Sequence, residues 1–184
     1  MIIFCALLAP APAFGQGHAP YSPSVAEHLK QSHELIESGR HDQASALLVN
    51  IIRTQPDCGE AYTLLGMLYL KQGNLRQAEA TLHKACELDS GNANAFNNYA
   101  NALYRQLKVK ESVEPYRKAL ALSREQDPKI LANLANAYAD LNMLDDAAAM
   151  FLKAVKVRPD YAVAYFGLGR MYYDHNKLDM AEVQ

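Results

Sequence analysis

Asparagine side chains are concentrated in two stretches of this sequence, at residues 94–101 and 133–136. A primary amide donates and accepts hydrogen bonds at the same time, so a row of asparagines can bind the backbone of an extended peptide without selecting its side chains. Aromatic and basic residues flank both stretches. The candidate binding residues are Asn97, Asn98, Asn101, Tyr104, Arg105, Lys129, Asn133, Asn136, Phe166, Arg170 and Tyr173.

The other residues that could carry chemistry form no catalytic or metal-binding pattern. The six histidines are scattered, and no pair of them has metal-ligand spacing together with a carboxylate. Gly167 and Gly169 resemble part of a dinucleotide-binding loop, but both fall inside a predicted helix. Asp145 and Asp146 open another predicted helix, where acidic side chains interact favourably with the helix dipole. The sequence therefore predicts a protein that is not an enzyme and binds no metal or cofactor.

Composition excludes some partners and leaves the cysteines open. With 18 basic and 20 acidic residues the net charge is -2, and no dense run of Lys and Arg could follow a phosphate backbone, so no nucleic acid partner is expected. The three cysteines include no CxxC pair. Cys58 and Cys86 could pair if the fold joined them, but their interpretation as small buried apolar residues is favoured.

A period of 34 residues organises the chain from residue 25 onward. The units are residues 25–58, 59–92, 93–126, 128–161 and an unfinished 162–184, with Asp127 inserted between the third and fourth. Two antiparallel helices approach most closely where both lack bulk, so small residues at two fixed positions predict a helical hairpin in each unit. These residues are Ser32, Gly66, Ala100, Ala135 and Gly169 at the eighth position, and Ala44, Ala78, Ser112, Ala147 and Ala181 at the twentieth.

The turn inside each predicted hairpin has its own signal. Residues that accept the left-handed backbone conformation at a helix end stand in this slot in four units, as Gly39, Gly73, Asn142 and Asn176. Leu107 occupies the same slot in the third unit. In the lengthened connection that follows, Asp127 before a proline is a favourable turn and helix start.

This pattern resembles the tetratricopeptide repeat over residues 25–184, in fragments such as AYTLLGMLYLKQGNLRQAEATLHKACELD and AVAYFGLGRMYYDHNKLDMAE. The resemblance implies an all-α fold, a right-handed superhelical solenoid of antiparallel helix hairpins. It also implies that the first helices line a concave inner wall, through positions two, five, six, nine, twelve and thirteen of each unit. The asparagines fall on this wall and are similar to the ladder in O-GlcNAc transferases. Asparagine is equally part of the ordinary repeat consensus, where it serves fold geometry.

A carboxylate clamp for chaperone tails, known in this family, is not expected. Such a clamp needs Lys at position five and Asn at position nine of one unit. Here these positions hold Thr63 with Met67 in the second unit, and Asn97 with Asn101 in the third. Binding to chaperone tails of this kind is therefore disfavoured.

Residues 1–20 differ from the repeat domain, which is assigned to residues 21–184. An apolar run from Ile2 to Leu8, followed by Ala, Pro and Gly, resembles a secretory signal peptide, although no Lys or Arg precedes it. A disordered leader is the alternative. Pro10 and Pro12 make a spanning helix improbable, so no integral membrane span is expected. The predicted location is exported, periplasmic or secreted, with cytoplasmic as the alternative.

The function predicted from the sequence is a non-catalytic scaffold or adaptor that holds an extended peptide segment of a protein partner in the concave groove. Because Gln184 comes only seven residues into the second helix of the fifth hairpin, we expect the chain to continue. One alternative is therefore the amino-terminal repeat region of a larger enzyme such as a glycosyltransferase. Another is an assembly factor for type IV pili, because FNNYANALYRQLKVKESVEPYRKALA is similar to the middle repeats of pilotins. The oligomeric state is left open.

Overall fold

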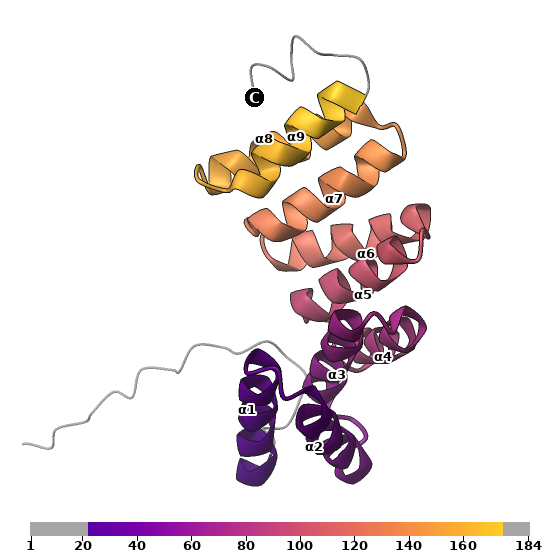
Figure 1. Cartoon of the computed structure of the whole chain (residues 1–184), viewed down its shortest axis with the longest axis vertical. Coiled ribbons are helices and arrows are strands. Elements are labelled where there is room, and N and C mark those ends of the chain that lie inside the picture. Colours follow the sequence, from indigo (N-terminus) through magenta and orange to yellow (C-terminus); the bar gives the residue numbers. More distant parts are fainter. Residues whose placement is uncertain (1–21, 175–184) are drawn as a thin grey trace, which may run out of the picture.

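The computed structural model describes residues 22–174, which form nine α-helices joined by short turns (Figure 1). The predicted leader lies outside the described residues, as do Asn176, Ala181 and the expected second helix of the fifth hairpin. The predicted all-α repeat fold is confirmed. The helices are α1 (Pro23–Glu37), α2 (His41–Thr54), α3 (Gly59–Gln72), α4 (Leu75–Leu88), α5 (Ala93–Arg105), α6 (Val109–Leu122), α7 (Pro128–Asp140), α8 (Leu144–Val157) and α9 (Ala162–Asp174).

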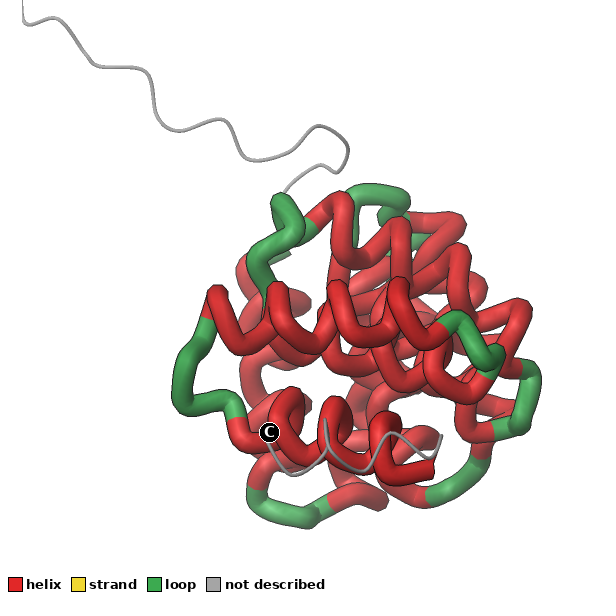
Figure 2. The backbone as a smooth tube through the Cα atoms, turned by 90° about the horizontal axis from the view of Figure 1, so that it is seen from above, coloured by secondary structure: helices red, strands yellow, loops and turns green. Residues whose placement is uncertain are grey.

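The helices are arranged in two layers. Each helix packs against the next one along the chain, and each odd-numbered helix also packs against the following odd-numbered helix. Within residues 22–174, no even-numbered helix contacts another even-numbered helix. The odd-numbered helices, which contact one another, therefore form the inner layer of a stack that rises from α1 to α9 (Figure 1). In the view along the long axis of the stack, the helices lie over one another within a compact outline (Figure 2).

The small residues of the repeat lie where the two helices of a hairpin meet. Gly66 shows the reason most directly, because a Cβ atom at this position would lie 2.4 Å from Cγ of Leu82. The prediction that these residues face the hairpin interior is confirmed by their burial. The fully buried members, at 0% exposure, are Ser32, Ala44, Ala78, Ala100, Ser112, Ala135 and Ala147.

The two glycines of α9 have different surroundings among the described residues. A Cβ atom at Gly169 would meet no atom within 4 Å there, and its predicted partner Ala181 lies outside them, so its packing stays a prediction. A close approach that was not predicted occurs at Gly167, where a Cβ atom would lie 2.4 Å from Cε1 of Phe151. The ring of Phe151 on α8 belongs to the preceding hairpin, so a neighbouring unit requires a small residue at Gly167.

The hairpin turns have the predicted backbone. Gly39, Gly73 and Asn142 have φ angles of 74°, 79° and 60°. Leu107 has a φ of 63° although it is neither glycine nor asparagine, and 86% of its surface is exposed. A left-handed conformation costs an L-residue roughly 1–2 kcal/mol, because Cβ approaches the following carbonyl oxygen. Leu107 is therefore a strained residue that buries little surface in return.

The connection lengthened by Asp127 holds two further residues with positive φ, Arg124 at 55° and Glu125 at 58°. Neither was expected from the sequence. The backbone amide of Glu125 bonds back to the carbonyl oxygen of Leu120 at 2.9 Å, which closes the end of α6. Asp127 then caps α7, because its carboxylate accepts hydrogen bonds from the backbone amides of the second and third helical residues, at 2.8 and 3.4 Å.

Cys58 and Cys86 are buried in two different apolar clusters, at 0% and 7% exposure. Their interpretation as buried small residues is therefore confirmed. Burial raises the pKa of the Cys86 thiol to about 12, with a smaller contribution from the charge of Asp89. A thiol with this pKa is protonated at neutral pH and is a poor nucleophile.

Candidate functional site

The inner wall is hollowed where α3, α5 and α7 run beside one another. The hollow has a volume of about 530 Å³ and reaches from the start of α7 back to α1. Of the predicted binding residues, Asn97, Asn98 and Lys129 lie here, together with their neighbour Asn94. The full lining is His33, Glu60, Thr63, Leu64, Met67, Asn92, Asn94, Asn97, Asn98, Asp127, Lys129 and Ile130.

Two of the asparagines are joined across neighbouring repeats. Nδ2 of Asn133, on α7, donates a hydrogen bond of 3.1 Å to Oδ1 of Asn97, on α5. Each amide therefore keeps one unused group: the amino group of Asn97, which can donate, and the oxygen of Asn133, which can accept. This pair offers a ligand both hydrogen-bonding functions of an amide at one point of the wall.

Asn98 has an available side chain. It is half-buried in the lining of the hollow, and its amide makes no side-chain hydrogen bond to any described residue. Both its donor and its acceptor can therefore serve a ligand.

Asn101 points the other way, into its own hairpin. Its Oδ1 accepts a hydrogen bond of 2.6 Å from the hydroxyl of Tyr116 on α6. Tyr116 is only 1% exposed, and burial raises the pKa of its hydroxyl well above the usual range. A buried hydroxyl needs a partner, so the main contact of Asn101 is structural.

The predicted residues near the ends of α5 and α7 also contact one another or the backbone. The hydroxyl of Tyr104 donates to Oδ2 of Asp140 at 2.5 Å, and burial together with this bond raises the pKa of Tyr104 to about 12. Nη1 of Arg105 donates to the carbonyl oxygen of Leu70 at 2.7 Å. These bonds tie one inner helix to the next.

Of the remaining predicted residues, Asn136 lies on α7 and the other three lie on α9, and none of the four lines the hollow. Nη2 of Arg170 donates to Oδ1 of Asn136 on α7 at 3.3 Å. Phe166 and Tyr173 are 73% and 65% exposed. The structure therefore divides the predicted site into a hollow at α3, α5 and α7 and a separate surface on α9.

The hollow includes residues that the search for amides missed. Glu60, Thr63, Leu64 and Met67 come from α3, and His33 comes from α1. All of them occupy positions two, five, six or nine of their units. A search by repeat position, without regard to residue type, would have found them.

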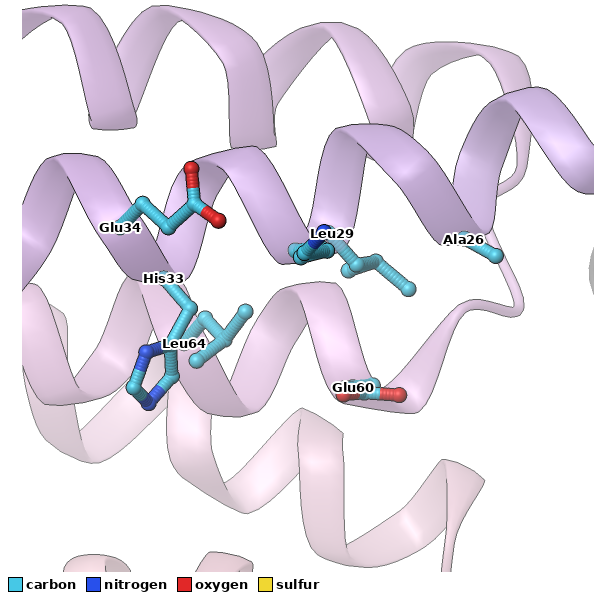
Figure 3. Close-up of a pocket in the computed structure, with 7 residues that line it drawn as sticks. Ala26, Leu29, His33, Glu34, Glu60 and Leu64 are labelled. Atoms are coloured by element: carbon cyan, nitrogen blue, oxygen red, sulfur yellow. The ribbon is translucent and has the colours of Figure 1, made fainter.

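A second hollow extends the inner wall to the amino-terminal hairpin (Figure 3). It has a volume of about 520 Å³ and lies between α1 and α3. In Figure 3, His33 on α1 reaches toward Leu64 on α3, while Glu34 and Glu60 stand on opposite helices. Glu60, His33 and Leu64 line both hollows, so the two are parts of one groove.

Residues 22–174 contain no group of His, Cys, Asp and Glu side chains that could hold a metal ion. None of the helices in this range has the length and apolar character needed to cross a bilayer.

Comparison with family models identifies the class of protein. Residues 35–95 match a model described as the tetratricopeptide repeat, and residues 135–176 match a second, described as the TPR repeat. The paired helices and the two-layer stack have the architecture of such repeats. This chain belongs to the tetratricopeptide repeat family.

Among characterised proteins, the chain is similar to the type IV pilus assembly protein PilF of Pseudomonas aeruginosa. The identity is 34% over 95 residues, which are 52% of this chain and 37% of PilF. It is also similar to the human protein O-mannosyl-transferase TMTC3, with 29% identity over 150 residues, or 78% of this chain and 16% of TMTC3. The chain thus spans well under half the length of either relative.

Solved structures show the same fold. PilW, a type IV pilus biogenesis factor, superposes with a TM-score of 0.82 at 19% identity, over 89% of this chain and 75% of PilW. YrrB, a TPR protein with an unusual peptide-binding site, superposes with a TM-score of 0.71 at 19% identity, over 84% of this chain and 79% of YrrB. At such identities the likeness concerns the fold alone.

Proposed function

We propose that this protein is a non-catalytic scaffold that holds an extended segment of a partner protein in its concave groove. The observation that carries the proposal is the set of unused amide groups on one wall of the hollow: the donor of Asn97 and both groups of Asn98. Amide side chains have no proton to transfer at neutral pH, so these groups are suited to binding and not to acid–base chemistry.

The bound segment would lie in an extended conformation along the inner helices. The free amino group of Asn97 would donate to a backbone carbonyl oxygen of the guest, and Oδ1 of Asn133 would accept from a backbone amide. Asn98 would make either contact. Apolar side chains of the guest would rest against Leu64 and Met67, which are the apolar part of the lining contributed by α3.

The test is a set of substitutions in the wall with a matched control. We expect Asn97→Ala, Asn98→Ala and Asn133→Ala together to weaken the binding of extended peptides selected from a random display library by at least tenfold, because three hydrogen-bonding side chains of about 0.5–1.5 kcal/mol each are removed. Asn50→Ala, on an exposed face of α2, is the control and should leave affinity unchanged. Fluorescence anisotropy measures both. Unchanged affinity in the triple variant would contradict the proposal.

Type IV pilus assembly is a second candidate, and it makes the partner more specific. It is favoured by the 34% identity to PilF over 95 residues and by the apolar leader, which would carry the protein out of the cytoplasm. In this reading the guest is a component of the pilus machinery. Deletion of the gene should then abolish surface pili seen by electron microscopy, and the wild-type chain should restore them. Normal pili in the deletion strain would exclude this role while leaving peptide binding open.

A further inference from the structure

The residues at the second position of the second, third and fourth repeats form a row along one side of the groove. The charge of these residues changes from one helix to the next. Glu60 on α3, Asn94 on α5 and Lys129 on α7 all occupy this position. All three side chains are exposed, and all three line the same hollow. One side of the groove therefore carries an acid, an amide and a base in order.

Neither charge of this row is neutralised within the described part of the chain. The carboxylate of Glu60 and the ammonium group of Lys129 have no ion pair and no hydrogen bond to any residue in the range 22–174. Other exposed charges are matched in some places, such as Lys71 with Glu37 and Lys153 with Glu125, and are unpaired in others. The two unmatched charges thus face the hollow from either end.

The other titratable groups of the hollow do not cancel this arrangement. Asp127 caps α7 with its carboxylate on two backbone amides, and the positive end of the helix dipole offsets part of its charge. His33 lines the hollow from α1. Lys30 and Glu34, which line the neighbouring hollow, contribute one charge of each sign from α1.

We infer that the groove selects a guest segment that carries a basic side chain where it crosses α3 and an acidic side chain where it crosses α7. This inference rests on the proposed peptide-holding function. Packed helices lie 8–10 Å apart, so two steps from α3 to α7 span roughly 16–20 Å. An extended chain advances about 3.3–3.6 Å per residue, which places the two charged residues of the guest about five or six positions apart.

Pairing between the groove charges and the guest charges should affect which guest sequence is preferred more than how tightly guests bind in general. Each exposed pair of opposite charges is worth about a two- to fivefold change in affinity, and like charges weaken binding by a similar factor. Salt screens exposed pairs, so the preference should shrink as ionic strength rises.

The experiment uses the full chain and labelled extended peptides of one neutral sequence. Two sites about six positions apart carry Lys and Glu, Lys and Lys, Glu and Glu, or Gln at both. The wild-type protein should prefer the mixed Lys and Glu peptide. Glu60→Lys should shift the preference to the peptide with two Glu, and Lys129→Glu should shift it to the peptide with two Lys. The double variant should prefer a mixed peptide in which Lys and Glu have exchanged places.

Controls separate this inference from the underlying function. Asp127→Asn keeps the helix cap and should keep the preference for the mixed peptide, while Glu60→Gln and Lys129→Gln should reduce the preference without reversing it. Binding of every peptide, the Gln form included, with equal affinity would overturn the inference and leave the peptide-holding function standing. Failure of every peptide to bind would overturn both. Circular dichroism verifies that each variant is folded.

Discussion

Asparagine side chains occur both in the interior of the hairpins and on the inner wall of the groove, but their hydrogen bonding differs between the two regions. On α5, Asn101 turns into the hairpin and accepts the hydrogen bond of a tyrosine that is 1% exposed, while Asn98, three residues earlier, faces the hollow with its amide unused. The hairpin interior satisfies its polar groups and fills its volume. The wall leaves polar groups and charges available, so changes there should affect binding while changes inside should affect stability.

The largest expected effect comes from the hairpin interior at α8. Phe151→Ala removes a ring that is 0% exposed and that lies against Gly167 of the next hairpin. We expect a loss of about 3–5 kcal/mol in the free energy of unfolding, from lost burial and the cavity left behind. Chemical denaturation measures it. The adjacent Leu152→Ala, at a residue 53% exposed, is the control and should change stability by less than about 0.5 kcal/mol.

The close contact between α3 and α4 comes next. Gly66→Ala would place a Cβ atom 2.4 Å from Cγ of Leu82, so one helix or the leucine must move. The expected destabilisation is about 1–3 kcal/mol, measured by thermal or denaturant unfolding. Adding Leu82→Ala removes the clash, so the two changes should be clearly non-additive. If the stability changes of the two single variants simply added in the double variant, the two helices could move apart at this crossing at little cost.

The two asparagines of α5 test the comparison most directly. Asn101→Ala leaves the buried hydroxyl of Tyr116 without its acceptor, at an expected cost of about 1–3 kcal/mol in stability. Asn98→Ala should change the free energy of unfolding by less than about 0.5 kcal/mol. Tyr116→Phe in the Asn101→Ala background should recover part of the loss, because no hydroxyl is then left unsatisfied. If Asn101→Ala and Asn98→Ala were equally stable, the structural role of Asn101 and the free side chain of Asn98 would no longer be distinguished.

The smallest effect is expected at a hairpin turn and has the opposite sign. Leu107→Gly removes a Cβ atom from a residue with a φ of 63° and 86% exposure. We expect a gain of about 1 kcal/mol, because the left-handed strain disappears and little buried surface is lost. The melting temperature should rise slightly. The converse change, Gly73→Leu at a φ of 79°, should lower it.

Much of the fold could be predicted because a repeat presents the same physical requirement several times. Small residues at the eighth and twentieth positions, and glycine or asparagine in the turns, each recur at fixed spacing, and their structural places agree with the prediction. Leu107 could be assigned to its turn only because the other units defined the slot. The close contact at Gly167 could not be predicted from the repeat spacing, because the ring that lies against it comes from another hairpin.

The site was less predictable, because it depends on how units sit against one another. Composition singled out the asparagines, but only the structure divided them into a pair joined across repeats, an unused one and one bound to Tyr116. The search for amides also passed over Glu60. Its importance follows from facing the same hollow as Lys129, two repeats away.

The sequence by itself determined the helical hairpins, their period and their turns, because these depend on residues close in the chain and on steric rules that act locally. The tertiary structure decided which amides are free, where the groove is hollow and which unpaired charges line it. Those properties arise from contacts between different repeats, and a pattern that is the same in every repeat carries no information about them.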